Sequence, residues 1–344
     1  MVTVVVVASH FEENNLQRIR EVDGARVLYD KDLVPPPRWD GDIVGEKDWK
    51  RSPEEETGFS SMLAQAEVLL DFPRGLSKPL PELAPKLRWV QGGMAGAGPV
   101  ARSFGLLDTN ITVTTAGGVF SNPLAEFVLA GMLHHAKDFE RLRERKKSKI
   151  WNEEQTGTLE GKTLCIIGMG SIGRAISERA RPFGMNILGV KRTVRDDDAA
   201  REHADELYAT GELHKALSRA DYVAVTLPHT EETEKLVDAE AIGAMKPGTH
   251  FANVGRGAVV DEAALAEALK SGHLSGAALD VFAQEPLPED SPLWELENVI
   301  ISPHSTDNVP GLMEKKLVEL FCANLRRYLA GEELVNVLDK KLLY

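Results

Sequence analysis

A glycine-rich turn between an apolar segment and a helix start constrains the fold more than any other feature of this chain. Leu164–Ile167 has the composition of a short buried strand, Gly168-Met-Gly-Ser-Ile-Gly173 follows directly, and a helix is predicted from Arg174. In such a motif the first glycine allows a tight turn, the second lets the backbone approach a pyrophosphate, and the third lets helix and strand pack closely. An ordinary glycine-rich turn is the alternative, but a strand before the motif and a helix after it are the context that nucleotide binding requires. We therefore expect a dinucleotide site formed by Gly168, Gly170, Ser171, Ile172 and Gly173.

The residues after the next predicted strand indicate which dinucleotide binds. Asn186–Val190 ends about 20 residues beyond the glycines, where an NAD site usually has Asp or Glu for the ribose 2′-hydroxyl. This chain has Lys191, Arg192 and Thr193 there instead, and Arg and Lys can bind a 2′-phosphate that a carboxylate would repel. The pattern favours NADPH over NADH, the alternative being ordinary exposed residues at a strand end. Asp196, Asp197 and Asp198 lie too far past the strand to replace the missing acid.

Composition limits the classes of protein and of partner. The 344 residues suffice for two domains, with 43% hydrophobic and 27% charged residues. The net charge of −13 disfavours nucleic-acid binding and favours a soluble cytoplasmic enzyme. With Cys165 and Cys322 as the two cysteines, neither a disulfide framework nor a metal site is expected. Val2–Ala8 is too short to span a membrane, so no membrane partner is expected.

Strand and helix signals alternate along the whole chain, which predicts an α/β fold with parallel sheets. We expect two Rossmann-like or flavodoxin-like domains with the active site in the cleft between them. Residues 119–306 are the predicted dinucleotide-binding domain, and residues 1–118 with 307–344 the predicted discontinuous substrate domain. The predicted strands are Val2–Ala8, Arg26–Tyr29, Val68–Leu70, Leu87–Gln91, Ile111–Thr114, Thr163–Ile167, Asn186–Val190, Tyr222–Val225, His250–Val254, Gly276–Leu279 and Val299–Ser302.

Other segments are assigned more simply. The Val34–Trp39 and Gly45–Glu56 segments are expected to be loops, and Glu12–Glu21 and Val309–Gly331 to be helices. A long helix is predicted after Asn122-Pro123, and the basic Arg141–Lys149 segment beyond it is expected to be a solvated helix face or an interface arm.

Residues whose side chains can take part in catalysis or binding follow three of the predicted strands. Ligands of open α/β sheets bind at the carboxyl ends of strands, and Arg256, Glu285 and His304 follow such ends. Arg256 stands between two glycines and can bind a carboxylate and a carbonyl oxygen with its planar fork. A carboxylate beside His304 would favour the charged imidazole, which can then protonate a carbonyl oxygen as hydride reaches the carbon. Singly, each of the three could be structural, but together they suit the reduction of a 2-keto acid.

These segments resemble the D-isomer-specific 2-hydroxyacid dehydrogenases. The resemblance covers the chain from about Asn122 onward and is thin over the first ~85 residues, where alternating strands give only weak support. The matching segments are Asn122–Glu126, Leu159–Gly173, Leu227–Thr233, Met245–Gly248, Asn253–Gly257, Ala278–Phe282, Gln284–Pro286 and Ser302–His304.

The resemblance implies a role for each matching residue. Arg256 would bind the substrate carboxylate and ketone oxygen, and His304 would be the general acid/base, oriented by Glu285. Asp280 would hold the nicotinamide carboxamide. The remaining cofactor contacts would come from His304 and from Leu227, Pro228, Thr233, Val254 and Gly255.

The Gly92–Gly98 segment resembles the family's substrate loop, with Ala95, Gly96 and Ala97 expected to bind the substrate through their backbone. It departs from the family pattern at Pro99, where Asp is usual shortly after the loop. Phe72 and Arg74 either help to select the substrate or belong to an ordinary loop, and the ordinary loop is favoured.

The function implied is reduction of a small 2-keto acid to a D-2-hydroxy acid with NADPH, NAD being possible, and glyoxylate and hydroxypyruvate are the favoured substrates. A homodimer built on Asn122–Trp151 is expected. The resemblance offers a role for Trp151 in the partner subunit's active site, as in some relatives, but a place in a core or an interface is favoured. The alternative is a dinucleotide-sensing scaffold that resembles the C-terminal-binding-protein corepressors. These share the fold and the three residues, so Arg256, Glu285 and His304 cannot exclude it.

Overall fold

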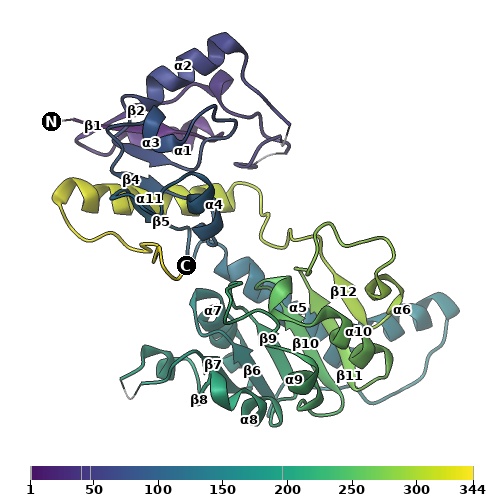
Figure 1. Cartoon of the computed structure of the whole chain (residues 1–344). Helices are drawn as coiled ribbons and strands as arrows, with labels where there is room; N and C mark the ends of the chain where they lie inside the picture. The colour runs from purple at the N-terminus through teal and green to yellow at the C-terminus, as the bar shows by residue number, and fades with distance from the viewer. Residues whose placement is uncertain (1, 40, 47, 196, 344) are drawn as a thin grey trace. The chain divides into compact units, whose positions relative to one another are not determined.

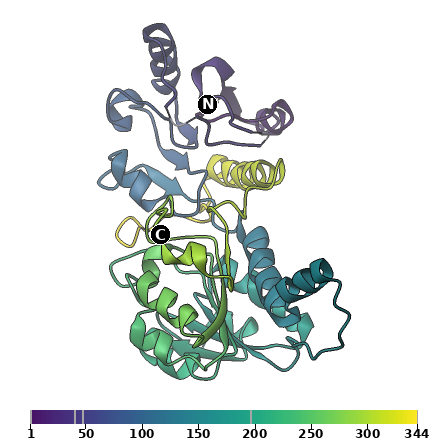
Figure 2. The ribbon, with the colours of Figure 1, turned by 90° about the vertical axis from the view of Figure 1, so that its right-hand side faces the viewer.

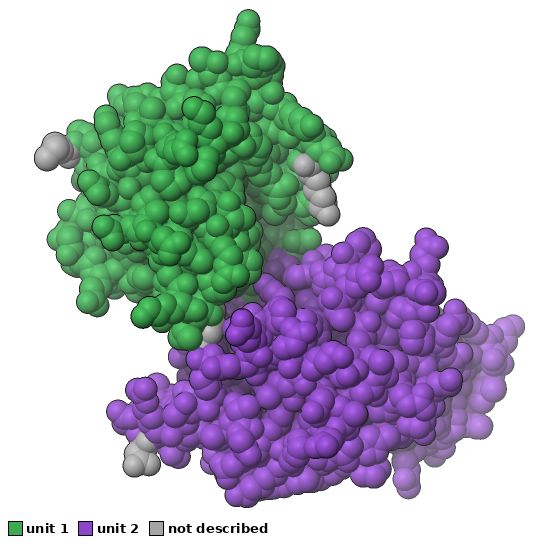
Figure 3. All heavy atoms as spheres, viewed as in Figure 1, with its two compact units in different colours: residues 1–120, 308–344 green, residues 121–307 purple. Residues whose placement is uncertain are grey.

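Two compact units make up the chain, each organised around one parallel sheet (Figures 1 and 3). The computed structural model describes residues 2–39, 41–46, 48–195 and 197–343. Unit 1 comprises residues 1–120 and 308–344, and unit 2 comprises residues 121–307. The predicted α/β class with two parallel sheets is confirmed.

Unit 1 contains a five-stranded parallel sheet in the order β2-β1-β3-β4-β5. Its strands are almost continuously apolar because both faces are covered. Val6, Leu69 and Val90 point to one face, whereas Val5, Val7, Val68 and Trp89 pack with α11 on the other. The elements are β1 (Thr3–Val7), α1 (Glu13–Arg20), β2 (Ala25–Leu28), α2 (Pro53–Leu63), β3 (Val68–Leu70), α3 (Leu80–Leu83), β4 (Trp89–Gln91), α4 (Gly98–Ser103), β5 (Thr112–Thr114) and α11 (Leu312–Ala330), with a 3-10 turn at Lys31–Leu33.

One expectation for unit 1 is wrong. The Gly45–Glu56 segment was expected to be a loop, but α2 begins at Pro53. The hydroxyl of Ser52 accepts a hydrogen bond from the amide of Glu55, whose side chain accepts one from the amide of Ser52. This capping box, with proline at the first helical position, starts the helix inside a segment whose charge suggests a loop. Lys47 lies outside the described residues.

Unit 2 contains a seven-stranded parallel sheet in the order β12-β11-β10-β9-β6-β7-β8. The strand order reverses beside β6, so the carboxyl ends of β6 and its neighbours form the edge where open α/β sheets bind ligands. The elements are α5 (Ser121–Lys137), α6 (Phe139–Ser148), β6 (Thr163–Ile167), α7 (Ser171–Ala180), β7 (Asn186–Lys191), β8 (Glu206–Ala209), α8 (Leu213–Leu217), β9 (Tyr222–Val225), α9 (Ala239–Gly243), β10 (Thr249–Asn253), α10 (Glu262–Lys270), β11 (Leu274–Leu279) and β12 (Val299–Ile301), with 3-10 turns at Arg181–Phe183, Ala199–Glu202, Thr210–Glu212, Gly257–Val259 and Pro292–Glu295.

The edge strand β8 is missing from the sequence prediction. It has four residues, Glu206–Ala209, of which Tyr208 is buried and Glu206 is exposed and paired with Arg219. An edge strand with one solvated face does not show the continuous apolar pattern by which its buried neighbours were found.

The basic segment after α5 forms an exposed helix. Figure 2 shows α5 and α6 together at one side of unit 2, and none of the residues of α6 is buried. Trp151, shortly after α6, is 95% exposed. Within the described part of the chain, no helix combines the length and the apolar character needed to cross a membrane.

Candidate functional site

The glycine-rich turn joins β6 to α7 with the geometry that its sequence predicts. Gly168 has a φ of +110°, which favours glycine, and a Cβ at Gly173 would lie 2.0 Å from the carbonyl oxygen of Gly168. At Gly170, by contrast, no atom lies within 4 Å of the position of a Cβ. Ser171 begins α7, so the first amides of the helix border this open space together with Ile172. The turn therefore has room for a pyrophosphate at a helix N-terminus.

The residues at the end of β7 are engaged in ion pairs. The Nζ of Lys191 lies 2.6 Å from Oδ2 of Asp198, and Nη2 of Arg192 lies 2.8 Å from Oε2 of Glu232. Thr193 follows directly, and Asp196 lies outside the described residues. Asp198 is thus brought back to the strand end as a partner of Lys191.

The turn after β9 is tightly hydrogen-bonded and lies against the turn after β10. The hydroxyl of Thr233 donates to the carbonyl of Pro228 at 2.7 Å and accepts from the amide of Thr230 at 2.8 Å. A Cβ at Gly255 would come within 2.6 Å of the carbonyl oxygen of Leu227, so these two backbones are in close contact. The predicted cofactor residues Leu227, Pro228, Thr233, Val254 and Gly255 therefore lie at adjoining strand ends.

Arg256 is half-buried beside this turn. Its Nη1 donates to the carbonyl of Gly255 at 2.7 Å, and its own carbonyl accepts from Nδ2 of Asn253 at 3.2 Å. No carboxylate of the described residues forms an ion pair with Arg256. The guanidinium therefore keeps donors for an external anion.

Asp280, directly after β11, is buried and organises the turn that carries the predicted histidine. Its Oδ1 accepts hydrogen bonds from the hydroxyl of Ser302 at 2.7 Å and from the amides of Ser305 at 3.1 Å and Thr306 at 3.3 Å. These donors flank His304 on both sides along the chain. Oδ2 of Asp280 is buried and has no partner among the described residues. An unpaired buried acceptor fits the amide donor of a nicotinamide carboxamide.

His304 and Glu285 form the predicted pair. The Nδ1 of His304 lies 2.8 Å from Oε2 of Glu285, and the side chains are 40% and 37% exposed. Oε1 of Glu285 accepts from the amide of Phe282 at 3.0 Å, which fixes the carboxylate against the backbone. With Nδ1 facing a carboxylate, Nε2 of the imidazole is the nitrogen left for proton transfer.

Asp307 is a residue of this region that the sequence analysis missed. Burial and the charge of Asp280 raise its pKa, while the charges of His304 and Arg256 act to lower it. Its electrostatic neighbours are thus three of the predicted site residues. The signal in the sequence was its place three residues after His304, which alone does not distinguish a site residue from a loop residue.

The expected substrate loop belongs to unit 1. It follows β4, and Ala97 directly precedes α4. The amide of Gly92 donates to the carbonyl of Thr114 at 2.8 Å, and the carbonyl of Met94 accepts from Ala116 at 3.0 Å. Among the described residues, no hydrogen bond from the amides of Ala95, Gly96 or Ala97 is found. Ala95 is exposed and Gly96 half-buried, so their amides are available to a ligand, whereas Ala97, expected to bind as well, is fully buried because it packs into the core of unit 1.

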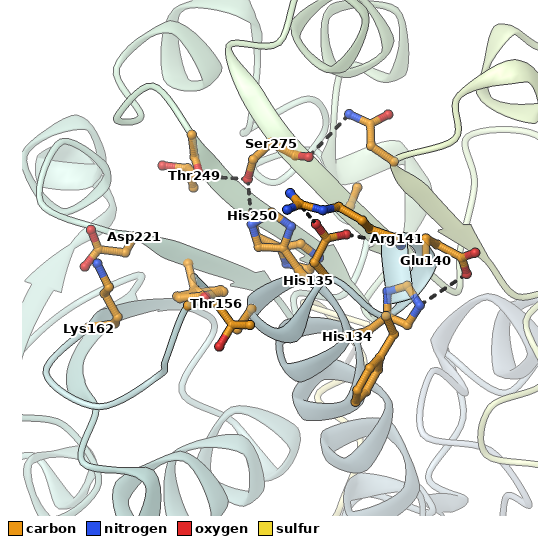
Figure 4. Close-up of a pocket in the computed structure, with 18 of the residues that line it drawn as sticks. His134, His135, Glu140, Arg141, Thr156, Lys162, Asp221, Thr249, His250 and Ser275 are labelled. Carbon is orange, nitrogen blue, oxygen red and sulfur yellow. Dashed lines mark hydrogen bonds and ion pairs between the residues drawn. The ribbon is translucent and has the colours of Figure 1, made fainter. Parts of the chain in front are cut away.

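A cavity of about 780 Å³ lies at the opposite edge of the unit 2 sheet, where the strands begin (Figure 4). Figure 4 shows His135, His250 and Ser275 close together in its wall. The hydroxyl of Ser275 donates to the carbonyl of Gly248, so Nε2 of His135, 3.0 Å away, donates to Ser275. Burial lowers the pKa of His250 to about 3 and also lowers that of His135. The predicted site residues do not line this cavity, and no group of three metal-binding side chains is found in the described ranges.

Comparisons with known proteins find a matching family model and curated relatives. Residues 129–306 match the family model described as D-isomer specific 2-hydroxyacid dehydrogenase, NAD binding domain. The glyoxylate/hydroxypyruvate reductase B of Citrobacter koseri is 38% identical over 73% of this chain and 78% of its own length. The glyoxylate reductase of Korarchaeum cryptofilum is 35% identical over 76% of this chain and 79% of its own length.

Solved structures extend the similarity to unit 1. A family member from Aeromonas salmonicida is 30% identical with a TM-score of 0.75 over 99% of this chain and 100% of its own. A D-isomer specific 2-hydroxyacid dehydrogenase from Xanthobacter autotrophicus, solved with NADPH and MES, is 26% identical with a TM-score of 0.78 over 100% of both chains.

The fold and the nucleotide turn define an NAD(P)-dependent oxidoreductase. The chain belongs to the D-isomer specific 2-hydroxyacid dehydrogenase family, and the resemblance noted in the sequence is confirmed. A dinucleotide-sensing scaffold is not favoured, because the named relatives are reductases.

Proposed function

We propose that this protein is an NADPH-preferring reductase that converts small 2-keto acids to D-2-hydroxy acids, with glyoxylate and hydroxypyruvate as the favoured substrates. The observation that carries the proposal is the His304–Glu285 pair in the same unit as the nucleotide turn and as Arg256, which forms no ion pair with a carboxylate of the described residues. The relatives named glyoxylate/hydroxypyruvate reductase support the substrate class.

Each residue then has one task. Arg256 binds the substrate carboxylate and the keto oxygen, which fixes the carbonyl and draws electron density toward its oxygen. When bound, the nicotinamide would supply the hydride that the keto carbon accepts. Nε2 of His304 gives its proton to the keto oxygen, and Glu285 stabilises the histidine through Nδ1. In unit 1, the amides of Ala95 and Gly96 are donors that suit a carboxylate.

The preference for NADPH rests on Lys191, Arg192 and Thr193 at the end of β7. Both cations have acidic partners, so a 2′-phosphate would replace Asp198 and Glu232 as their counter-charge. Glu232 is 66% exposed and can be released to water, whereas Asp198, whose side chain is 8% exposed, keeps the hydrogen bond from the amide of Ala200. The Xanthobacter autotrophicus neighbour solved with NADPH supports this choice of cofactor.

A steady-state assay tests the proposal. The purified protein is offered NADPH or NADH with glyoxylate, hydroxypyruvate, pyruvate and a branched 2-keto acid, and we expect faster turnover with NADPH and glyoxylate or hydroxypyruvate. His304→Asn should lower kcat by on the order of 10²–10⁴. His203→Asn is the matched control, since His203 also faces a glutamate, Glu178 at 3.6 Å, in the same unit. Absence of turnover from protein that binds NADPH would contradict the proposal.

A further inference from the structure

The carboxyl ends of three adjacent strands of unit 1 are joined by one buried side chain. Asp71 directly follows β3, which lies between β1 and β4 in the sheet. Its carboxylate accepts a hydrogen bond from the hydroxyl of Ser9, just beyond β1, and its Oδ1 accepts from the amide of Gly93, beyond β4, at 3.0 Å. Asp71 is 8% exposed, so these contacts are made in the interior.

The contact with Gly93 fixes the first residues of the expected substrate loop. A Cβ at Gly93 would lie 2.9 Å from Oδ1 of Asp71. Only glycine at position 93 therefore lets the backbone approach the carboxyl group this closely. Asp71 itself has a φ of +67°, and its amide donates to the carbonyl of Gln91 at 2.7 Å. Asp71 therefore bonds to Gln91, the last residue of β4, through its amide and to Gly93, just beyond the strand, through its carboxylate.

The loop beyond this anchor presents donors without partners. Gly92 is bonded to Thr114 at the end of β5 and Met94 to Ala116 just beyond it, whereas the accessible amides of Ala95 and Gly96 have no hydrogen-bond acceptor among the described residues. Successive free amides bind an anion well only when the backbone already has the right shape, because ordering it during binding costs affinity. The hydrogen bond between the Gly93 amide and Asp71 orders the backbone at the start of the loop before a ligand binds.

We propose that Asp71 is the positioning residue that presets the Gly92–Gly98 loop for a substrate carboxylate, a role that rests on the proposed function of this loop. It does not contact the substrate. It holds the Gly93 amide and the Ser9 hydroxyl, so that the loop presents the amides of Ala95 and Gly96 to one anion. The side chain therefore controls substrate affinity and leaves hydride and proton transfer to the residues of unit 2.

The kinetic test compares Asp71→Ala with Asp71→Asn in the full-length protein, with saturating NADPH and glyoxylate as the varied substrate. Asp71→Ala should raise the KM for glyoxylate about tenfold, because it removes the hydrogen bonds from Ser9 and Gly93 that order the loop, while kcat changes less than about threefold. Asp71→Asn should restore most of the affinity, since an amide can accept from Gly93 and donate to Ser9. The KM for NADPH should be unchanged in both.

Asp42→Ala is the matched control. Asp42 is also a buried, loop-organising carboxylate of unit 1, bonded to Arg38 and to the amides of Val44 at 2.9 Å and Gly45 at 3.2 Å. The Asp42→Ala substitution should lower Tm as Asp71→Ala does, but it should leave the KM for glyoxylate unchanged. Equal effects of the two substitutions on KM, or an unchanged KM in Asp71→Ala, would reduce Asp71 to a structural role.

A second measurement does not need turnover and remains usable if Asp71→Ala fails to fold. Hydrogen exchange of the Gly92–Gly98 amides is followed with NADP⁺ and with or without oxalate, a carboxylate that cannot be reduced. Oxalate should protect these amides in the wild type and in Asp71→Asn, and less in Ser9→Ala, which removes one of the two contacts. Protection that is equal in Ser9→Ala and wild type overturns the role of Asp71. If the wild type reduces glyoxylate but oxalate does not protect the loop amides, the proposed roles of the loop and of Asp71 in binding the carboxylate are wrong and the reductase proposal stands. If oxalate protects the amides but no turnover is found, the proposed reductase activity is wrong.

Discussion

At the scale of single residues, unit 2 contains carboxyl groups with opposite electrostatic environments. Asp307 is half-buried near Asp280, and both burial and that charge raise its pKa. Asp261, the N-cap of α10, has its pKa lowered by the amide of Ala264 and by Lys235. With rising pH, ionisation of Asp307 should therefore lower the stability of the fold, whereas ionisation of Asp261 should raise it.

Asp307→Asn should stabilise the protein at neutral pH. Because the folded-state pKa of Asp307 is raised, the ionised carboxylate opposes folding, and this penalty is absent below the ordinary pKa of about 4. Melting curves between pH 4 and 8 should show a Tm above that of the wild type at pH 8 and equal to it at pH 4. Asp261→Asn should show the reverse sign, with a loss of Tm at pH 8 that disappears as the pH falls. A pH-independent difference for Asp307→Asn would contradict this assignment.

The site residues differ in how far the sequence could predict them. The pairing of His304 with Glu285 was expected, because each follows a strand end and such ends meet at one sheet edge. The anchoring of the His304 turn by Asp280 was not expected, because it depends on the amides of Ser305 and Thr306, whose direction is set by the turn and not by residue type. The ion pair between Lys191 and Asp198 was missed for a related reason, since a loop brings Asp198 back to the strand.

At the scale of elements, the join between β6 and α7 depends on the third glycine of the turn. Gly173→Ala would place a methyl group 2.0 Å from the carbonyl oxygen of Gly168, so α7 must move away from the strand. We expect a lower Tm and at least a tenfold weaker binding of NADPH, measured by calorimetry.

Gly243→Ala is the control for this substitution. Gly243 lies in α9, and no atom is found within 4 Å of the position of its Cβ. The added methyl should stabilise the protein by about 0.4–1 kcal/mol through the unfolded state and leave NADPH binding unchanged. If Gly173→Ala behaved like Gly243→Ala, close packing at the turn would not be the reason for the glycine.

The elements themselves were predictable where burial on both faces produces a continuous apolar segment. This holds for β1, β3, β6 and β9, all of which lie inside their sheets. It fails for the edge strand β8, where alternate residues are solvated, and for the start of α2, where a local capping box outweighs a loop-like composition. In both cases a few local contacts decide the structure, and these leave little trace in the hydrophobic pattern.

At the scale of the whole molecule, the exposed apolar side chains on α6 and just after it favour self-association. Phe139, Leu142, Ile150 and Trp151 are 48%, 50%, 50% and 95% exposed, although α6 is otherwise strongly charged. We therefore propose that the protein is a homodimer that uses the Asn122–Trp151 region. Apolar side chains gathered on one projecting element are typical of an interaction surface.

Light scattering after gel filtration tests the dimer. The wild type should have twice the chain mass of 37.7 kDa, and the double variant Leu142→Glu/Trp151→Ala should have the chain mass itself. Trp294→Ala is the control, because Trp294 is a 52% exposed tryptophan of the same unit outside this region. A wild type of 37.7 kDa at micromolar concentration would contradict the dimer.

The route of the chain through its two units bears on how the protein is made. Unit 1 receives α11 only after the whole of unit 2 has been passed, and Leu317, Phe321 and Leu325 of that helix belong to the core on one face of the unit 1 sheet. During translation, unit 2 is a continuous stretch that can fold as soon as it leaves the ribosome. The first 120 residues emerge earlier yet must wait with an uncovered apolar sheet face until α11 is synthesised. The half of the protein made first is therefore the half completed last, and it is the half that a nascent chain would present to chaperones.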